Sequence, residues 1–289
     1  MSFTVRKLAG RPALSFLEGP TAHGRPLLFL HGVGRCAEDF LPLARALWSQ
    51  YTVRALDLRG HGNSERGREG YRVVDYVPDV VRFILDSFKD PVVLCGHSLG
   101  AMVALAVAAE IPASVQALVL EDPPFHTMGS RIVSTPWQTL FSGMYEVARR
   151  GGSQVAITEA LSKMRVASSD ANGFTTLGEL RSRGSLEFSA ICLSRLDPDV
   201  FRPIIEQRWL EGYDERELFA RVQCPVLLLQ GDPTSGGALT DADADLAAGL
   251  IRNCQLVRFP GTGHLIHWDQ PKAFMRSAEM FLASTYAHS

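Results

Sequence analysis

Short apolar runs alternate along the chain with longer stretches in which apolar residues recur every three or four positions. The short runs are rich in Val, Leu and Phe, as expected for strands buried within a sheet. Strands are predicted at residues 5–8, 13–17, 27–30, 51–56, 92–95, 115–120, 226–229 and 255–259, the first two as an antiparallel pair. Helices are predicted at residues 37–48, 73–88, 101–109, 243–251 and 272–282. This alternation predicts an α/β fold with a mostly parallel sheet.

The alternation is interrupted between residues 125 and 214, where the pattern indicates helices and no strand. Trp137, Phe141 and Met144 fall on one helical stripe of this segment, and a second helix is predicted at residues 203–210. We interpret residues 1–124 and 215–289 as the core. Residues 125–214 are then a helical insertion over the carboxyl edge of the sheet, and its stripe is a candidate substrate pocket.

The sequence Gly96-His97-Ser98-Leu99-Gly100 lies between a predicted strand and an Ala-rich predicted helix. In a strand–turn–helix context, G-x-S-x-G is typical of a nucleophile elbow, which holds a serine hydroxyl exposed at a helix N-terminus. The alternative is an ordinary helix N-cap serine. The context favours Ser98 as a catalytic nucleophile.

A catalytic serine needs a base to accept its proton and a third group to orient that base. His264 follows the predicted strand at residues 255–259 and is the candidate base, whereas His267 is expected to pack in the following turn. Asp232 directly follows the strand at residues 226–229, so we predict it as the acid, with a turn-forming role as the alternative. Asp122, after the strand at residues 115–120, is the competing acid.

Two peptide N–H groups are needed to stabilise the oxyanion of an acyl-transfer intermediate. One is expected from Leu99, and the other from Val33 in the loop after the strand at residues 27–30. The spacing of the histidines does not indicate a metal site, and the sequence has no G-x-G-x-x-G or Walker loop. No metal and no cofactor are therefore expected.

The formal net charge of the 289-residue chain is −2, which gives no electrostatic reason to expect nucleic acid or an anionic membrane as a partner. Five scattered cysteines argue against a disulfide framework. No signal peptide and no bilayer-spanning run are apparent, so a soluble cytoplasmic protein acting on a small molecule is expected. Its oligomeric state is left open.

Together these motifs, with His31-Gly32, the segment Asp57-x-Arg-Gly-His-Gly-x-Ser64 and Gly261-x-Gly-His264, resemble the α/β-hydrolase fold family, in its branch with a helical cap. The resemblance implies an eight-stranded, mostly parallel sheet, a Ser98–Asp232–His264 triad and a cap that shapes the pocket. In many relatives the acid lies further beyond the strand-end glycine than Asp232 does. A serine at the elbow argues against haloalkane dehalogenases and epoxide hydrolases, which carry Asp there.

The expected activity is hydrolysis of a small or medium ester, lactone or thioester through an acyl-enzyme on Ser98. The alternatives are a C–C bond hydrolase, an amide hydrolase or an acyltransferase of the same fold, and a receptor that retains the fold without catalysis. The insertion also carries arginines that could bind a substrate carboxylate, although surface arginine is the ordinary case: Arg131, Arg149, Arg150, Arg181, Arg183 and Arg195.

Overall fold

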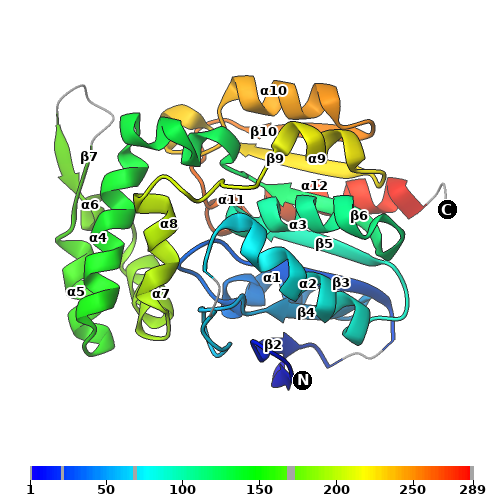
Figure 1. The fold of residues 1–289 in the computed structure, drawn as a ribbon, viewed down its shortest axis with the longest axis horizontal. Coiled ribbons are helices and arrows are strands. Elements are labelled where there is room, and N and C mark those ends of the chain that lie inside the picture. The colour runs from blue at the N-terminus through cyan, green and yellow to red at the C-terminus, as the bar shows by residue number, and fades with distance from the viewer. Residues whose placement is uncertain (1, 21–22, 68–69, 168–172, 287–289) are drawn as a thin grey trace.

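A central eight-stranded sheet organises the computed structural model, which describes residues 2–20, 23–67, 70–167 and 173–286 (Figure 1). The strand order is β1-β2-β4-β3-β5-β6-β9-β10. The two antiparallel pairs are β1 with β2 and β2 with β4, and the other neighbours are parallel. The strands are β1 (Thr4–Leu8), β2 (Leu14–Glu18), β3 (Arg25–Leu30), β4 (Tyr51–Leu56), β5 (Val92–His97), β6 (Val115–Glu121), β9 (Val226–Gly231) and β10 (Cys254–Phe259). The predicted fold class is confirmed.

Both faces of the sheet are buried at its central strands β3, β5, β6 and β9, which explains the continuous apolar runs that these strands contain. In β3, Leu27 and Phe29 belong to one hydrophobic cluster and Leu28 and Leu30 to another, as the two-residue period of a strand requires. Side chains of α1 (Leu41–Leu47) and α12 (Pro271–Tyr286) join the first cluster. The second cluster contains side chains of α2 (Val73–Ser87), α3 (Leu99–Glu110), α9 (Glu215–Arg221) and α10 (Asp241–Leu250).

The segment 125–214 lies to one side of the sheet, at the left of Figure 1, and is mainly helical. Its longest helix is α4 (Pro136–Arg150), which begins after Thr135, whose side-chain oxygen accepts a hydrogen bond from the Trp137 N–H. The other helices are α5 (Gln154–Ser162), α6 (Leu177–Leu180), α7 (Arg183–Ser194) and α8 (Arg202–Ile205).

Two expectations for this segment were wrong. It contains a short antiparallel pair, β7 (Arg165–Ala167) and β8 (Phe174–Thr176), where no strand was predicted. The helix predicted at residues 203–210 is α8, which ends at Ile205. Gln207 adopts φ 59°, a left-handed conformation that stops a right-handed helix.

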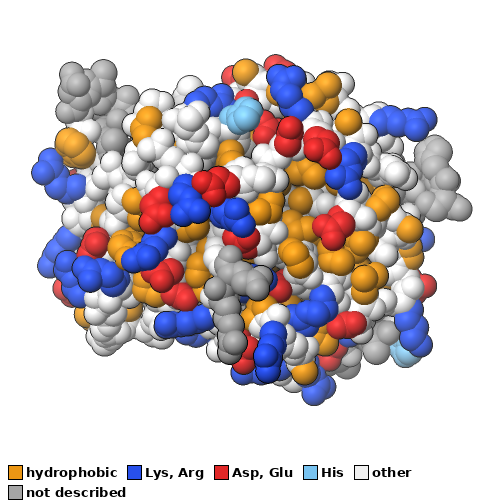
Figure 2. All heavy atoms as spheres, viewed as in Figure 1, with side chains coloured by type: hydrophobic (Ala, Val, Ile, Leu, Met, Phe, Trp, Pro, Cys, Tyr) orange, Lys and Arg blue, Asp and Glu red, His pale blue; other side chains and the backbone are white. Residues whose placement is uncertain are grey.

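Acidic and basic side chains are interspersed over the face shown in Figure 2, in keeping with the net charge of −2. Within the described residues, no helix is both long and apolar enough to cross a membrane. All five cysteines are free thiols, and the Sγ atoms of Cys36 and Cys192 lie 3.2 Å apart in the interior.

Candidate active site

Ser98 occupies a sharp turn between β5 and α3, with φ 52° and ψ −114°. A non-glycine residue pays roughly 1–3 kcal/mol for such a backbone, so the surroundings must enforce it. The Ser98 N–H donates to the Glu121 carbonyl at 2.9 Å. A Cβ on Gly96 would collide with the Gly100 carbonyl, and a Cβ on Gly100 would collide with that of Leu30. Both glycines are therefore needed for strand and helix to approach this closely.

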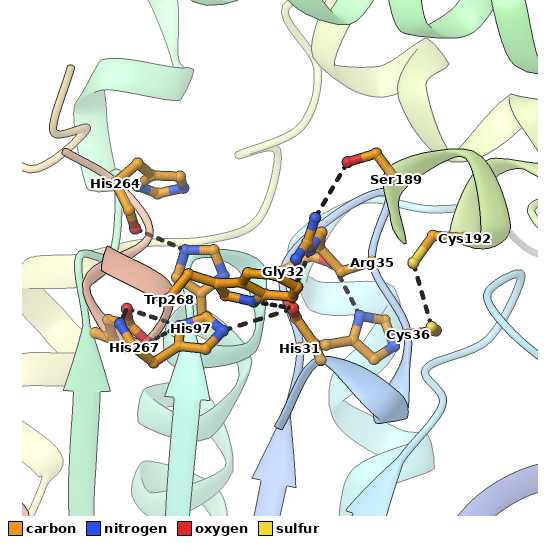
Figure 3. A network of polar contacts seen from close by, with 12 residues as sticks. His31, Gly32, Arg35, Cys36, His97, Ser189, Cys192, His264, His267 and Trp268 are labelled. Atoms are coloured by element: carbon orange, nitrogen blue, oxygen red, sulfur yellow. Dashed lines mark hydrogen bonds and ion pairs between the residues drawn. The ribbon is translucent and has the colours of Figure 1, made fainter. Parts of the chain in front are cut away.

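Ser98 and His264 line one cavity of about 90 Å³ between the carboxyl edge of the sheet and segment 125–214. Ser98 is 2% exposed and His264 is 7% exposed, so neither is open to bulk solvent. A ligand would reach them through this cavity, which both residues line. His264 lies in the loop between β10 and α11 (Ile266–Asp269), and its carbonyl contacts the His97 Nε2 at 3.0 Å (Figure 3). The structure thus brings together the predicted nucleophile and the predicted base.

Asp122 supplies the carboxylate that contacts the imidazole of His264. Its Oδ2 lies 2.6 Å from the His264 Nδ1, and the side chain is fully buried. The same carboxylate accepts backbone N–H groups from Gly231 at 2.9 Å, Ala238 at 2.7 Å and Leu239 at 3.3 Å. These donors hold the charged carboxylate in place and compensate for its removal from water.

Asp232, the predicted acid, makes its hydrogen bonds within its own loop and to the loop before His264. Its Oδ1 accepts the Thr234 N–H at 2.8 Å and the Thr234 hydroxyl at 2.6 Å, while its Oδ2 accepts the Gly261 N–H at 2.8 Å. These hydrogen bonds lower the pKa of the Asp232 carboxyl. Such contacts are those of the turn-forming role that was the alternative for Asp232, and they connect it to the loop that leads to His264.

Sheet order explains why the nearer carboxylate comes from β6. This strand lies directly beside β5, which carries Ser98, whereas β9 lies one strand further away. Both aspartates come between Ser98 and His264 in the chain, so chain order does not distinguish them. The Asp122 backbone, at φ 45°, is itself in the left-handed region at the strand end.

The loop after β3 is held by two buried histidines. His31 Nδ1–H donates to the Gly32 carbonyl at 2.8 Å, and its Nε2 accepts the Leu58 N–H at 3.0 Å. His61 Nε2 accepts the Gly34 N–H at 3.2 Å. Burial lowers the pKa of His31 to about 4 and that of His61 well below its ordinary value, so both rings are neutral. Val33 lines the cavity together with Ser98, and its N–H as an oxyanion donor remains a prediction.

Two walls of different character close the cavity. One is apolar and comes from α4, with Trp137, Phe141 and Met144 among its residues, and the Trp137 ring meets the His264 ring edge-on at 4.9 Å. The other contains the polar residues Arg181, Ser185 and Ser189 together with Leu186, and it was not predicted as a unit. The three polar residues are spaced four apart, which places them on one face of a helix, and this spacing can be recognised in the sequence.

A network of buried polar contacts adjoins the cavity, and Figure 3 labels Arg35, His267 and Trp268 among its members. The Arg35 guanidinium pairs with the Asp39 carboxylate through two nitrogens and donates to the Ser189 hydroxyl at 3.2 Å. Asp39 also accepts from the Trp268 indole N–H at 2.6 Å. The His267 Nδ1 lies 2.8 Å from the Glu121 carboxylate, and with Asp39 this carboxylate raises the pKa of His267 to about 9 despite the burial of the ring.

Cys36, Glu38 and Asp57 form a cluster of possible metal-ligating atoms within 4.8 Å of one another. These groups already have protein partners. Asp57 accepts the Ala37 N–H at 2.8 Å, Glu38 pairs with Arg195 at 2.9 Å, and Cys36 contacts Cys192. Burial raises the pKa of Asp57 to about 6, which disfavours the anion that a metal would need. The absence of a metal remains a prediction.

Comparisons with known proteins agree with this architecture. Residues 27–277 match the model of the alpha/beta hydrolase family. A 2-(acetamidomethylene)succinate hydrolase from Mesorhizobium japonicum is 36% identical over 113 residues, which span 39% of this chain and 40% of that protein. An (E)-2-((N-methylformamido)methylene)succinate hydrolase from Acinetobacter baylyi is 22% identical over 99% of both chains.

Solved structures share the fold. One of E-2-(acetamidomethylene)succinate hydrolase superposes with a TM-score of 0.75 at 22% identity, over 98% of this chain and 100% of that chain. The enol-lactonase from Burkholderia xenovorans LB400 gives a TM-score of 0.72 at 18% identity, over 96% of this chain and 100% of that one.

Proposed function

The chain belongs to the alpha/beta hydrolase family and is an enzyme that hydrolyses its substrate, and from this premise we propose that Ser98, His264 and Asp122 form its catalytic triad. The bond cleaved is proposed to be a carboxylic ester, lactone or thioester of small or medium size. The observation that carries the proposal is the buried 2.6 Å contact between Asp122 and the Nδ1 of His264, a residue that lines the same cavity as the strained Ser98.

The geometry supports a two-step mechanism. Because Asp122 accepts the Nδ1–H, His264 keeps a lone pair on Nε2 and can take the Ser98 proton as the hydroxyl attacks the acyl carbon. The Val33 and Leu99 N–H groups stabilise the oxyanion that forms. The imidazolium then protonates the leaving group, and in the second step His264 activates the water that hydrolyses the acyl-enzyme.

A second candidate is hydrolysis of an acyl–nitrogen bond. It is favoured by the names of the relatives, which are hydrolases of an acetamidomethylene and a formamidomethylene succinate. The same triad serves both reactions, but an amine must be protonated as it leaves, so the second reaction depends more strongly on His264 as an acid. Matched esters and amides of one acyl group separate the two candidates.

A fluorophosphonate probe followed by intact-mass measurement tests the proposal. One adduct is expected in the wild type and none in Ser98→Ala, because activation requires the adjacent base and oxyanion donors. Ser153 provides a matched control, since it caps α5 in the way an ordinary N-cap serine does. Ser153→Ala should label like the wild type. An adduct that persists in Ser98→Ala, or is absent in the wild type, would contradict the proposal.

A further inference from the structure

Two arginines, Arg35 and Arg181, line the cavity that contains Ser98, and they differ in whether a carboxylate forms an ion pair with them. The charge of Arg35 is paired: two of its nitrogens bond the Asp39 carboxylate, a third donates to Ser189, and its guanidinium lies 4.7 Å from the centre of the Phe188 ring. Because Asp39 already balances the charge of Arg35, we assign this residue to the structure of the wall.

Arg181 has no such partner. Among the described residues, no carboxylate lies within ion-pairing distance of its guanidinium, whereas Arg183, two positions on, pairs with Glu187 at 2.8 Å. Partial burial lowers the pKa of Arg181, and the charge of Arg35 acts in the same direction, while the more distant carboxylate of Asp269 opposes both. A partly buried guanidinium that forms no ion pair is destabilising, so its place beside the cavity that contains Ser98 requires an explanation.

The surroundings of Arg181 suit an anionic group. It precedes Ser182, the N-cap of α7, and Ser185 and Ser189 follow it at intervals of four on the cavity side of the helix. The facing wall from α4 is apolar. A substrate with one charged end would therefore meet a cation and hydroxyls on one side and hydrocarbon on the other.

We propose that Arg181 binds a carboxylate on the acyl substrate, so that the enzyme prefers an acyl compound with a second, free carboxylate, such as a dicarboxylic acid monoester or monoamide. This inference rests on the proposed function, since it needs Ser98 to react with the acyl carbon. Guanidinium and carboxylate match as a planar, two-point hydrogen-bonded pair. Arg181 is thus a specificity-determining residue, separate from the triad.

Paired esters test the inference. Monomethyl succinate, glutarate and adipate carry the carboxylate at increasing distance, and methyl 4-methylpentanoate replaces the succinate carboxylate with an isopropyl group of similar shape. Hydrolysis is followed in a pH-stat, with kcat and KM measured separately. In the wild type, one of the monoesters should exceed the neutral ester in kcat/KM at least tenfold.

Three variants assign the preference to Arg181. In Arg181→Gln, the ratio of kcat/KM for the best monoester to that for the neutral ester should fall by about 10- to 100-fold, mainly through KM, as expected for loss of a charge-assisted hydrogen bond. Arg181→Lys should be intermediate because lysine keeps the charge but not the planar fork. Arg183→Gln is the matched control and should keep the ratio within about twofold.

The outcomes separate this inference from the proposed function. Equal losses of Arg181→Gln on both esters would place the guanidinium at the oxyanion or in the fold and would overturn the inference, as would a wild type that prefers the neutral ester. Failure of the wild type to label at Ser98 would overturn the proposed function instead.

If Arg181→Gln does not fold, protection from the probe decides the matter in the wild type. Succinate should slow labelling of Ser98 and neutral succinamide should not. Equal effects of the two compounds would contradict carboxylate binding.

Discussion

At the scale of single residues, two aspartates show how neighbours assign a role to a carboxylate. Asp122 is fully buried and accepts three backbone N–H groups in addition to its contact with His264. Asp232 is only partly buried and accepts hydrogen bonds from Thr234 and Gly261. In the proposed triad, only the first is placed to fix the tautomer of His264 and to stabilise its imidazolium form during the reaction.

Substitution of each aspartate by asparagine should therefore give unequal effects. Asp122→Asn should lower kcat by about two to four orders of magnitude, because the shape is kept and the charge beside His264 is lost. Asp232→Asn should lower kcat less than about tenfold, through a small displacement of the loop that it holds. Steady-state kinetics on one ester measures both, with thermal melting to verify folding. A larger loss in the folded Asp232→Asn variant would restore Asp232 as the acid.

The proposed nucleophile and base could be expected from sequence because each belongs to a local motif, Gly96–Gly100 and Gly261–His264. The proposed acid could not, because its selection depends on which strand lies beside β5. Strand order is a property of long-range pairing, and both aspartates end a parallel strand at the same edge. Arg181 was one of six candidate arginines, and only the cavity distinguishes it from those at the surface.

At the scale of elements, the turn from β5 into α3 depends on two glycines. A methyl group on Gly100 would collide with the Leu30 and His31 carbonyls of β3 and its loop, which are backbone atoms and cannot move independently. Gly100→Ala should therefore destabilise the protein by several kcal/mol or prevent folding. Gly249, in α10, has open space at its Cβ, so Gly249→Ala is the matched control and should not destabilise. Chemical denaturation measures both, and equal stability of the two variants would contradict this account of the turn.

The apolar wall from α4 gives a prediction about specificity. Phe141→Ala or Met144→Ala enlarges the cavity, so the preferred acyl chain should become longer by one or more carbons while fluorophosphonate labelling of Ser98 continues. Thr139→Ala, on the exposed side of the same helix, is the control and should keep the wild-type preference. A panel of esters graded by acyl length measures the change. Proportional losses across the panel, with unchanged stability, would argue against a pocket role.

The central strands β3, β5, β6 and β9 were predictable because each contains a continuous run of at least four apolar residues buried in the sheet. The pair β7–β8 was not, since each strand has three residues and neither Arg165–Ala167 nor Phe174–Thr176 shows an alternating pattern. The early end of α8 was not predicted because it depends on the left-handed backbone of Gln207. Glycine indicates such a conformation in a sequence, whereas glutamine does not.

At the scale of the whole molecule, buried ionic groups connect the sheet to the loops that carry the site. The ring of His267 faces Glu121 at the end of β6, Asp39 in the turn before α1, and the neutral ring of His97. Arg35 balances Asp39, and Glu121 balances a protonated His267, so the group is neutral as a whole. Protonation of His267 is thus part of the folded state.

This arrangement predicts how stability depends on pH. The pKa of His267 is about 9 in the folded protein, above the ordinary 6.5, so the folded state binds the proton more tightly than the unfolded state. The stabilisation is complete below about pH 6.5 and is lost as pH rises through about 9, with a slope of at most about 1.4 kcal/mol per pH unit. His267→Gln should lower the free energy of unfolding at pH 6 and flatten its fall toward pH 9.5. Urea denaturation across this range tests the prediction, with the exposed His23→Gln as control. A His267→Gln variant with the full wild-type slope would show that another group titrates.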